Sequence, residues 1–127
     1  MFQKLFSIVS VNLMFDGSIR ITYGDTYNEQ LANQSSPLFR EKARKFKTML
    51  ETVYGRSNLG PALKQLSIIG FKNGSLIVFF RIVLDRRKLP KSVSTIEDNL
   101  KKILMDELTN LRPIAMKNLR VDLNKFM

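Results

Sequence analysis

The chain has 127 residues, 44% of them hydrophobic, and this length fits one compact domain with its own core. Lys and Arg outnumber Asp and Glu by 21 to 11, and the net charge of +10 favours anionic partners such as nucleic acid, lipid headgroups or sulfated glycans. The sequence contains neither Cys nor His, which excludes Cys/His zinc sites, thiol nucleophiles and mechanisms with an imidazole base, and no cofactor is expected.

The first segment of the chain is apolar from Phe2 to Phe15, but polar residues interrupt it. No apolar run approaches the roughly 20 residues that span a bilayer, and the segment has no small-residue cleavage site of the signal-peptide kind. We therefore expect no membrane insertion by this chain, and any anchor would lie outside it. Residues 1–14 are interpreted as a lead-in segment, with an extension of the first strand as the alternative.

The first predicted element is a strand that follows Asp16-Gly17. Apolar and polar residues alternate from Ser18 onward, and this period of two is typical of a strand with one buried face. The residues expected on the buried face are Ile19, Ile21 and Tyr23. A polar loop over residues 25–36 follows the strand.

A helix is predicted next, from Ser36 to Gly55. Ser36 is a favourable N-cap, Pro37 suits the first helical position, and a glycine commonly ends a helix. Apolar residues spaced by three and four form one stripe: Phe39, Ala43, Phe46, Leu50 and Val53. The basic residues of this helix are interpreted as a solvated outer face, with a binding surface as the alternative. They are Arg40, Lys42, Arg44, Lys45 and Lys47.

Two strands joined by a tight turn are predicted at residues 66–71 and 76–84. The turn between them is Lys72-Asn73-Gly74, and Asn-Gly is the strongest short-range signal of a β-hairpin. The second strand is the most apolar segment of the chain, and we therefore expect it in the middle of the sheet.

A basic loop, Asp85–Pro90, precedes a second amphipathic helix. Ser94 and Glu97 have the spacing of a capping box. Apolar residues then continue at helical spacing: Ile96, Leu100, Ile103, Leu104, Leu108 and Leu111. Pro113 closes this region. A final alternation predicts a fourth strand, at Leu119, Val121 and Leu123.

The predicted order of elements is strand, helix, strand, strand, helix, strand. This order predicts an α+β fold of the ferredoxin-like, split β-α-β type, in which a four-stranded antiparallel sheet carries both helices on one face. The fold hosts many unrelated functions, so a function has to be argued from a site.

The segment Phe71–Phe79, in which Gly74-Ser75 precedes an aliphatic run, resembles the signature of SEA domains between the second and third strands. A second stretch, from Arg20-Ile21-Thr22 through Thr26-Tyr27-Asn28 to Ser35-Ser36, is similar to the opening of the stem SEA domain of matriptase-like and enteropeptidase-like type II transmembrane serine proteases. The resemblance covers residues 15–123, and residues 15–127 are interpreted as an SEA-like domain. Leu76 departs from the pattern, because many self-cleaving members have a β-branched residue there.

The resemblance implies a non-catalytic extracellular module at the cell surface. It would serve as a spacer or interaction domain in the stem of a single-pass type II membrane protein whose serine protease domain lies elsewhere in the same polypeptide. It also implies self-cleavage between Gly74 and Ser75 by an N-to-O acyl shift, with Ser75 as the nucleophile. The rest of that polypeptide is the expected partner, anionic glycans are a candidate partner, and the oligomeric state stays open. The absence of Cys counts against this location, because it is more typical of reducing compartments.

Two triplets, Asn33-Gln34-Ser35 and Asn73-Gly74-Ser75, fit the N-glycosylation pattern. Asn33 is the better acceptor, because it lies in a long polar loop, whereas a tight turn limits access to Asn73. A second candidate surface is Arg86-Arg87-Lys88, which would attract anionic glycans or headgroups, with a contribution to solubility alone as the alternative.

RNA binding is the competing function, because RNA-recognition motifs share this order of elements and are often basic. Their third strand carries a Lys/Arg-Gly-aromatic pattern whose aromatic rings stack on bases. The segment Ser75–Ile82 lacks that glycine, and its adjacent Phe79 and Phe80 should point to opposite faces of the sheet. No nucleic-acid partner is therefore expected.

Overall fold

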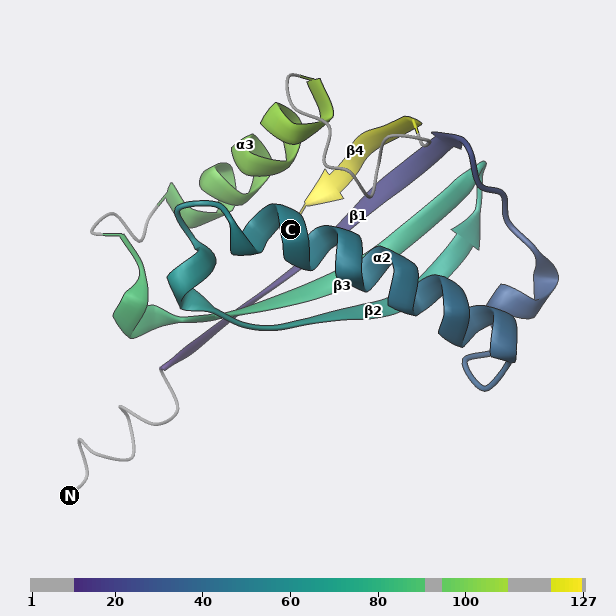
Figure 1. Cartoon of the computed structure of the whole chain (residues 1–127), viewed down its shortest axis with the longest axis horizontal. Helices are drawn as coiled ribbons and strands as arrows, with labels where there is room; N and C mark the ends of the chain where they lie inside the picture. The colour runs from purple at the N-terminus through teal and green to yellow at the C-terminus, as the bar shows by residue number, and fades with distance from the viewer. Residues whose placement is uncertain (1–10, 91–94, 110–119, 127) are drawn as a thin grey trace.

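The computed structural model describes residues 11–90, 95–109 and 120–126 (Figure 1). The strands are β1 (Asn12–Tyr23), β2 (Leu63–Asn73), β3 (Leu76–Asp85) and β4 (Arg120–Phe126). The helices are α2 (Pro37–Gly55) and α3 (Ile96–Thr109), and three short 3-10 turns are η1 (Glu29–Ala32), η2 (Gly60–Ala62) and η3 (Arg86–Lys88).

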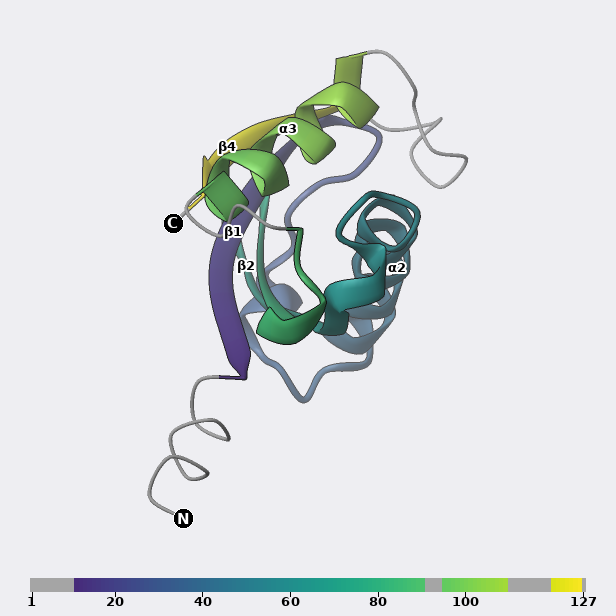
Figure 2. The same cartoon turned by 90° about the vertical axis from the view of Figure 1, so that its left-hand side faces the viewer.

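The strands form one antiparallel sheet in the order β2-β3-β1-β4. β1, β2 and β3 pair over long stretches, and β4 continues the sheet along β1 with two shifts of register. Both helices lie on one face of this sheet, and Figure 2 shows the opposite face without a helix in the described part of the chain. The predicted α+β class, with two helices and an antiparallel sheet, is confirmed.

The helix α2 begins and ends where the sequence predicts. The Ser36 hydroxyl accepts a hydrogen bond from the Phe39 amide at 3.0 Å, which satisfies one of the free N–H groups of the first turn. Its apolar stripe is buried except for Ala43, which is partly buried, and the Tyr54 hydroxyl donates to the Leu100 carbonyl of α3 at 3.1 Å. The two helices are therefore joined through a buried contact.

Alternate residues of β3 form the centre of the core. Leu76, Val78, Phe80, Ile82 and Leu84 are all 0% exposed, and they face the helices. Because β3 lies between β2 and β1, its prediction as a mid-sheet strand is confirmed.

The structure differs from the prediction at the ends of several elements. β1 begins at Asn12, because Asn12 and Leu13 still pair with the last residues of β3. Tyr23, predicted on the buried face, is 65% exposed; the register with β4 shifts between Ile21 and Tyr23. The polar loop contains the turn η1, which buries Leu31. Some of the predictions fall outside the described residues: residues 1–10 of the predicted lead-in segment, and Ser94, Leu111, Pro113 and Leu119.

Candidate functional site

The turn between β2 and β3 contains only Gly74 and Ser75. Asn73 and Leu76 are the last paired residues of the two strands, and Gly74 and Ser75 are exposed beyond them. The Gly74 amide donates to the Oδ1 atom of Asn73 at 2.8 Å. The candidate scissile bond therefore lies at the tip of a two-residue hairpin, where solvent reaches it.

Both residues flanking this peptide bond have positive φ angles. Gly74 has φ of 133° and Ser75 has φ of 57°, and Ser75 is the only non-glycine residue with positive φ in the described ranges. An L-residue in the left-handed region costs about 1–2 kcal/mol. At Gly74, a Cβ atom would lie 3.1 Å from Cδ1 of Ile77, so the position favours glycine on two grounds. The turn thus holds a strained serine next to an obligatory glycine.

The strands below the turn hold it in place. Phe71 of β2 packs edge-on against Phe39 of α2, with ring centroids 5.1 Å apart, and also contacts Phe46. Leu76, the first residue after the turn, is fully buried. Since core residues on both sides fix the two strands, the turn cannot relax without disturbing packing.

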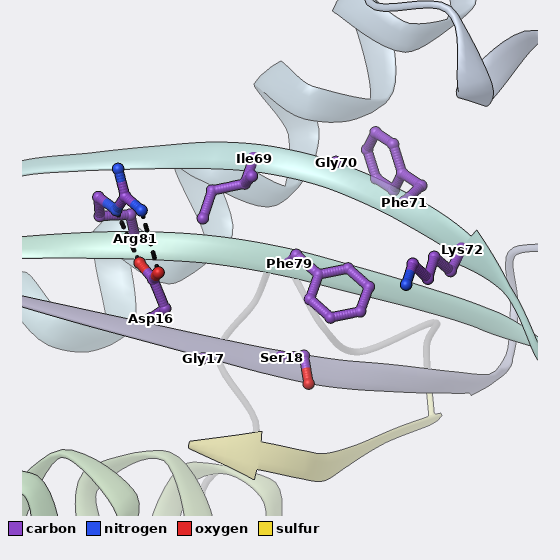
Figure 3. A pocket seen from close by; sticks show the side chains of 9 residues that line it. All are labelled: Asp16, Gly17, Ser18, Ile69, Gly70, Phe71, Lys72, Phe79 and Arg81. Atoms are coloured by element: carbon purple, nitrogen blue, oxygen red, sulfur yellow. Dashed lines mark hydrogen bonds and ion pairs between the residues drawn. The ribbon is translucent and has the colours of Figure 1, made fainter. Parts of the chain in front are cut away.

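The outer face of the sheet carries a groove of about 360 Å³ that the sequence analysis missed (Figure 3). Phe79 and Ile69 provide its apolar lining, and Lys72 lies at one end, with its Nζ atom 5.4 Å from the centroid of the Phe79 ring. At the other end Arg81 and Asp16 form a bidentate pair, with N–O distances of 2.7 and 3.0 Å. The hydrogen bonds from Arg81 lower the pKa of Asp16, so this carboxylate is ionised at neutral pH.

The signal for this groove was present in β3. The strand alternates between fully buried residues and half-buried ones, and Phe79 and Arg81 belong to the half-buried set. An aromatic ring and a guanidinium on the solvent face of a strand mark a candidate binding surface.

The two predicted glycosylation sites are both exposed. The Oδ1 atom of Asn33 accepts a hydrogen bond from the Ser35 amide at 2.9 Å in the loop after η1. Asn73 is the last residue of β2, and its Oδ1 atom is engaged by the Gly74 amide. Each side chain therefore accepts one backbone hydrogen bond, and the use of either asparagine stays a prediction.

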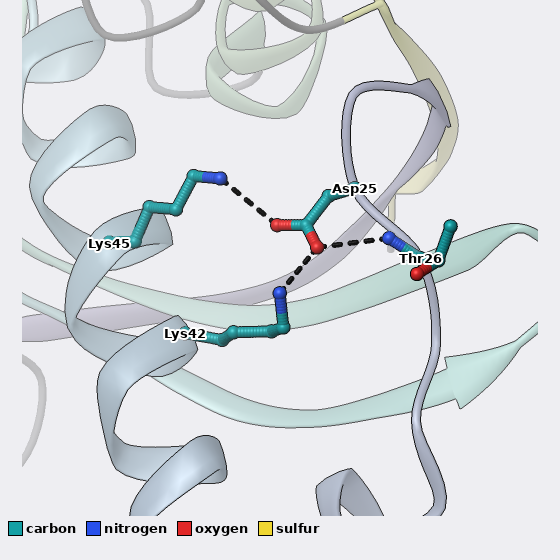
Figure 4. A network of polar contacts seen from close by, with 4 residues as sticks. All are labelled: Asp25, Thr26, Lys42 and Lys45. Carbon is teal, nitrogen blue, oxygen red and sulfur yellow. Dashed lines mark hydrogen bonds and ion pairs between the residues drawn. The ribbon is translucent and has the colours of Figure 1, made fainter.

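The basic face of α2 is only partly a free solvated surface. Lys42 and Lys45 both bind the carboxylate of Asp25, Lys45 at 3.0 Å, and the Thr26 amide donates to the same carboxylate (Figure 4). Burial raises the pKa of Asp25, but the hydrogen bonds from the two lysines outweigh it and the net pKa is lowered. The interpretation as a solvated outer face is therefore wrong for Lys42, which is largely covered, whereas Lys45 is exposed as predicted although it also fastens the loop after β1 to the helix. Arg40, Arg44 and Lys47 are exposed as predicted.

The basic turn η3 is organised by one carboxylate. Asp85, whose side chain is 6% exposed, accepts from the Arg87 amide at 2.9 Å and from the Arg87 guanidinium at 3.1 and 2.9 Å. The Arg87 hydrogen bonds lower the pKa of Asp85 to about 2. Arg87 is thus partly neutralised, while Arg86 and Lys88 stay exposed beside it.

Among the described helices, none has the length and apolar character that crossing a membrane requires. The described residues also contain no cluster of three or more carboxylate, His or Cys side chains that could hold a metal ion. The features that remain as candidate sites are the strained turn, the outer groove and the exposed cations.

A comparison with protein families matches the SEA domain over residues 13–122. The match includes the hairpin with Gly74-Ser75 and runs from the second residue of β1 into β4. The chain therefore belongs to the SEA domain family.

Proposed function

We propose that this chain is an extracellular spacer module in the stem of a membrane-anchored protein, and that it cuts its own backbone between Gly74 and Ser75. SEA domains are generally extracellular and non-catalytic, which supports the location and the absence of turnover. The main observation in support of cleavage is that the residues on both sides of this peptide bond have positive φ angles.

The reaction is an N-to-O acyl shift followed by hydrolysis. The Ser75 hydroxyl oxygen attacks the carbonyl carbon of Gly74, the C–N bond breaks, and the hydroxyl proton passes to the released Ser75 amine. The resulting ester joins Gly74 to the side chain of Ser75. Water then cleaves this ester, giving a carboxylate on Gly74 and restoring the hydroxyl of Ser75, which now has a free amino group.

Folding supplies the energy for this shift. An amide is more stable than an ester, and the sequence has no His or Cys to act as a base. A residue held in a sparsely populated backbone region stores about 1–3 kcal/mol, provided the surrounding structure over-determines it. The buried alternate residues of β3 and the aromatic cluster around Phe71 meet that condition. In the unfolded chain this strain is absent, so we expect no cleavage there.

The two products stay together in one sheet. Residues 1–74 contribute β1, α2 and β2, whereas residues 75–127 contribute β3, α3 and β4. Because β3 lies between β2 and β1, each fragment contributes strands that flank a strand of the other. Separation would expose the apolar core, which is unfavourable at about 25 cal/mol per Å² of apolar surface.

The wider setting of the module is a second part of the proposal. The likeness of the stretch from Arg20 to Ser36 to stem SEA domains supports a parent of the type II transmembrane serine protease class, with the catalytic domain in another part of the polypeptide. The exposed Asn33 supports N-glycosylation in that setting. The sheet order β2-β3-β1-β4 with antiparallel neighbours supports the ferredoxin-like arrangement for the fold.

The cleavage is tested by mass and by gel. The purified chain should give two bands on a denaturing gel and one species in native size exclusion. The masses of the two fragments should add up to the mass of the uncut chain plus one water. Ser75→Ala should leave a folded, uncut chain, because the nucleophile is gone. Ser35→Ala removes a hydroxyl from another exposed turn and should cut like the wild type. A wild-type chain that stays intact for days in native buffer contradicts the proposal.

A further inference from the structure

We propose that the groove on the outer face of the sheet binds an acidic sugar, a pyranose ring that carries a carboxylate. The groove belongs to the face opposite the helices and is separate from the scissile bond, so the inference does not rest on self-cleavage (Figure 3). Its volume of about 360 Å³ lies at the lower end of the roughly 300–1,000 Å³ typical of ligand pockets.

The floor of the groove is a flat aromatic surface with open space beside it. Phe79 pairs across the ladder with Gly70, and a Cβ atom built on Gly70 meets nothing within 4 Å. An irregularity in the pairing between Ile68 and Gly70 turns Ile69 toward the groove, where it is 37% exposed. A ring with polarised C–H groups can therefore lie on the negative face of Phe79, with Ile69 as a side wall.

The charged groups at the two ends suit different parts of such a ligand. Lys72 is exposed and lies over the Phe79 ring, and within the described residues it forms no ion pair with a carboxylate. Its ammonium group is placed to receive the ligand's carboxylate. At the other end, the Asp16 carboxylate and the Arg81 guanidinium, about two-fifths exposed, offer acceptors and donors for ring hydroxyls.

The charge of this face matches an anion rather than a neutral or basic ligand. Arg20, Lys72 and Arg81 project from the outer face of β1, β2 and β3. These three strands place two carboxylates on this face, Asp16 and Asp85, and Asp85 is already paired with Arg87, so Asp16 is the carboxylate that lines the groove. An acidic ligand is therefore attracted to the groove as a whole.

A single-stranded nucleic acid fits the same face less well. Proteins that bind such strands stack successive bases on several aromatic side chains. In the described strands this groove has one ring, Phe79, because the neighbouring Phe80 is buried against the helices at 0% exposure. One aromatic platform between a cation and an ion pair matches a single small ring.

The experiment is an NMR titration of the ¹⁵N-labelled chain with sodium D-glucuronate and with N-acetylneuraminate at about 0.15 M salt. D-Glucose is the neutral control, and single-stranded oligouridylate tests base stacking. The expected result is saturable shifts of the amides of residues 69–72 and 79–81 with both acidic sugars, and at least about tenfold weaker binding of glucose. The same shifts should appear in cut and uncut chain, so a failure of self-cleavage leaves this test intact.

Three variants locate the binding. Lys72→Met should weaken binding of glucuronate about tenfold, and Phe79→Leu about fivefold, whereas Lys47→Met on α2 removes the same charge elsewhere and should change it less than about twofold. Three results would overturn the proposal: no saturable shifts in the groove, equal shifts at all the basic clusters, or tighter binding of oligouridylate than of either acidic sugar.

Discussion

The chain forms two different kinds of turn at the two ends of β3. At its start, Gly74 and Ser75 turn through two positive φ angles, and the Gly74 amide donates to the side chain of its own neighbour, Asn73. At its end, Asp85 accepts three hydrogen bonds from Arg87 and the chain enters η3 with negative φ angles at both caps. The same strand thus joins a strained turn to a capped one.

This difference indicates where the chain can react. The capped turn lowers its free energy through local polar contacts, so opening it costs those contacts. The strained turn has a high local free energy that only the packing of β2 and β3 maintains. Exposure and basic sequence would make η3 a target for an external protease, whereas the proposed self-cleavage relies on strain at Gly74–Ser75.

The largest expected effect comes from removing the packing behind the strained turn. Phe80→Ala in the uncut Ser75→Ala background should lower the free energy of unfolding by about 3–5 kcal/mol, because Phe80 is fully buried. With Ser75 restored, Phe80→Ala should also slow cleavage. The free-energy barrier to cleavage should rise by at least as much as the free energy of unfolding falls. Urea denaturation and gel densitometry measure the two effects. Val83→Ala, a half-buried position of the same strand, is the matched control. Cleavage at the wild-type rate in Phe80→Ala would contradict the proposal that packing of the folded core drives cleavage.

A smaller effect should follow from relieving the strain itself. Ser75→Gly and Ser75→Ala both lack the nucleophile, but glycine tolerates φ of 57° without the cost of about 1–2 kcal/mol. Glycine also loses about 0.4–1 kcal/mol through the entropy of the unfolded chain. We therefore expect Ser75→Gly to be more stable than Ser75→Ala by roughly 0.5–1 kcal/mol in urea denaturation. A Ser75→Gly chain that is less stable than Ser75→Ala by about 0.4–1 kcal/mol would argue that the turn stores no strain. Gly74→Ala should instead lower the stability, because the added Cβ atom would meet Ile77.

The capped turn should show the smallest effect, and only in part of the pH range. The folded-state pKa of Asp85 is lowered to about 2 from 3.8, so its ionised form stabilises the fold above pH 4, and this contribution is lost as pH falls from about 4 to about 2. In the Ser75→Ala background, Asp85→Asn should be less stable than its parent at pH 7, and the gap should narrow by pH 2. Urea midpoints at pH 7, 4 and 2 measure it, with exposed Asp106→Asn as the control. A gap that stays constant down to pH 2 would show that the carboxylate charge is not what caps η3.

The same variant sharpens the comparison through a protease. In Asp85→Asn, trypsin should cut within Arg86–Lys88 faster than in its parent, because Arg87 is released from the bidentate contact. Limited proteolysis followed by mass spectrometry identifies the bond cut. Equal rates in the two chains would mean that the cap does not protect the turn.

The sequence predicted those parts of the fold in which local and tertiary preferences agree. In α2 the Ser36 cap, Pro37 and the apolar stripe all specify the same bounds, and the structure has them. The hairpin was also predicted, from Asn73-Gly74, but its turn lies later than predicted, at Gly74 and Ser75, because Lys72 and Asn73 still pair with β3. The sequence leaves the start of β1 open between a lead-in segment and an extension of the strand, because Leu13 and Met14 continue an apolar run without clear alternation. Pairing with the end of β3 makes them a strand, which agrees with the alternative interpretation.

The candidate site was predictable in position but not in geometry. Gly74 and Ser75 were identified by resemblance, whereas no propensity indicates that a serine will take positive φ. The outer groove depends on one irregularity between Ile68 and Gly70, which decides that Ile69 faces it and that Gly70 lies opposite Phe79. The partners of Asp25 and Asp16 lie 17 or more positions away in the chain, and such pairings follow from the assembled fold rather than from any local pattern.

The pairing of β4 with β1 decides how the module responds to mechanical force. The two strands are antiparallel neighbours, so the start of β1 and the end of β4, at Phe126, lie toward the same end of the sheet. Tension applied through Asn12 and Phe126 would therefore peel β4 from β1 one hydrogen bond at a time rather than shear the whole ladder at once. In an intact chain this peeling is followed by unfolding of a continuous polypeptide. If the chain is cut at the β2–β3 turn as proposed, the same tension would instead separate the two halves, so the force that the domain could transmit would be limited.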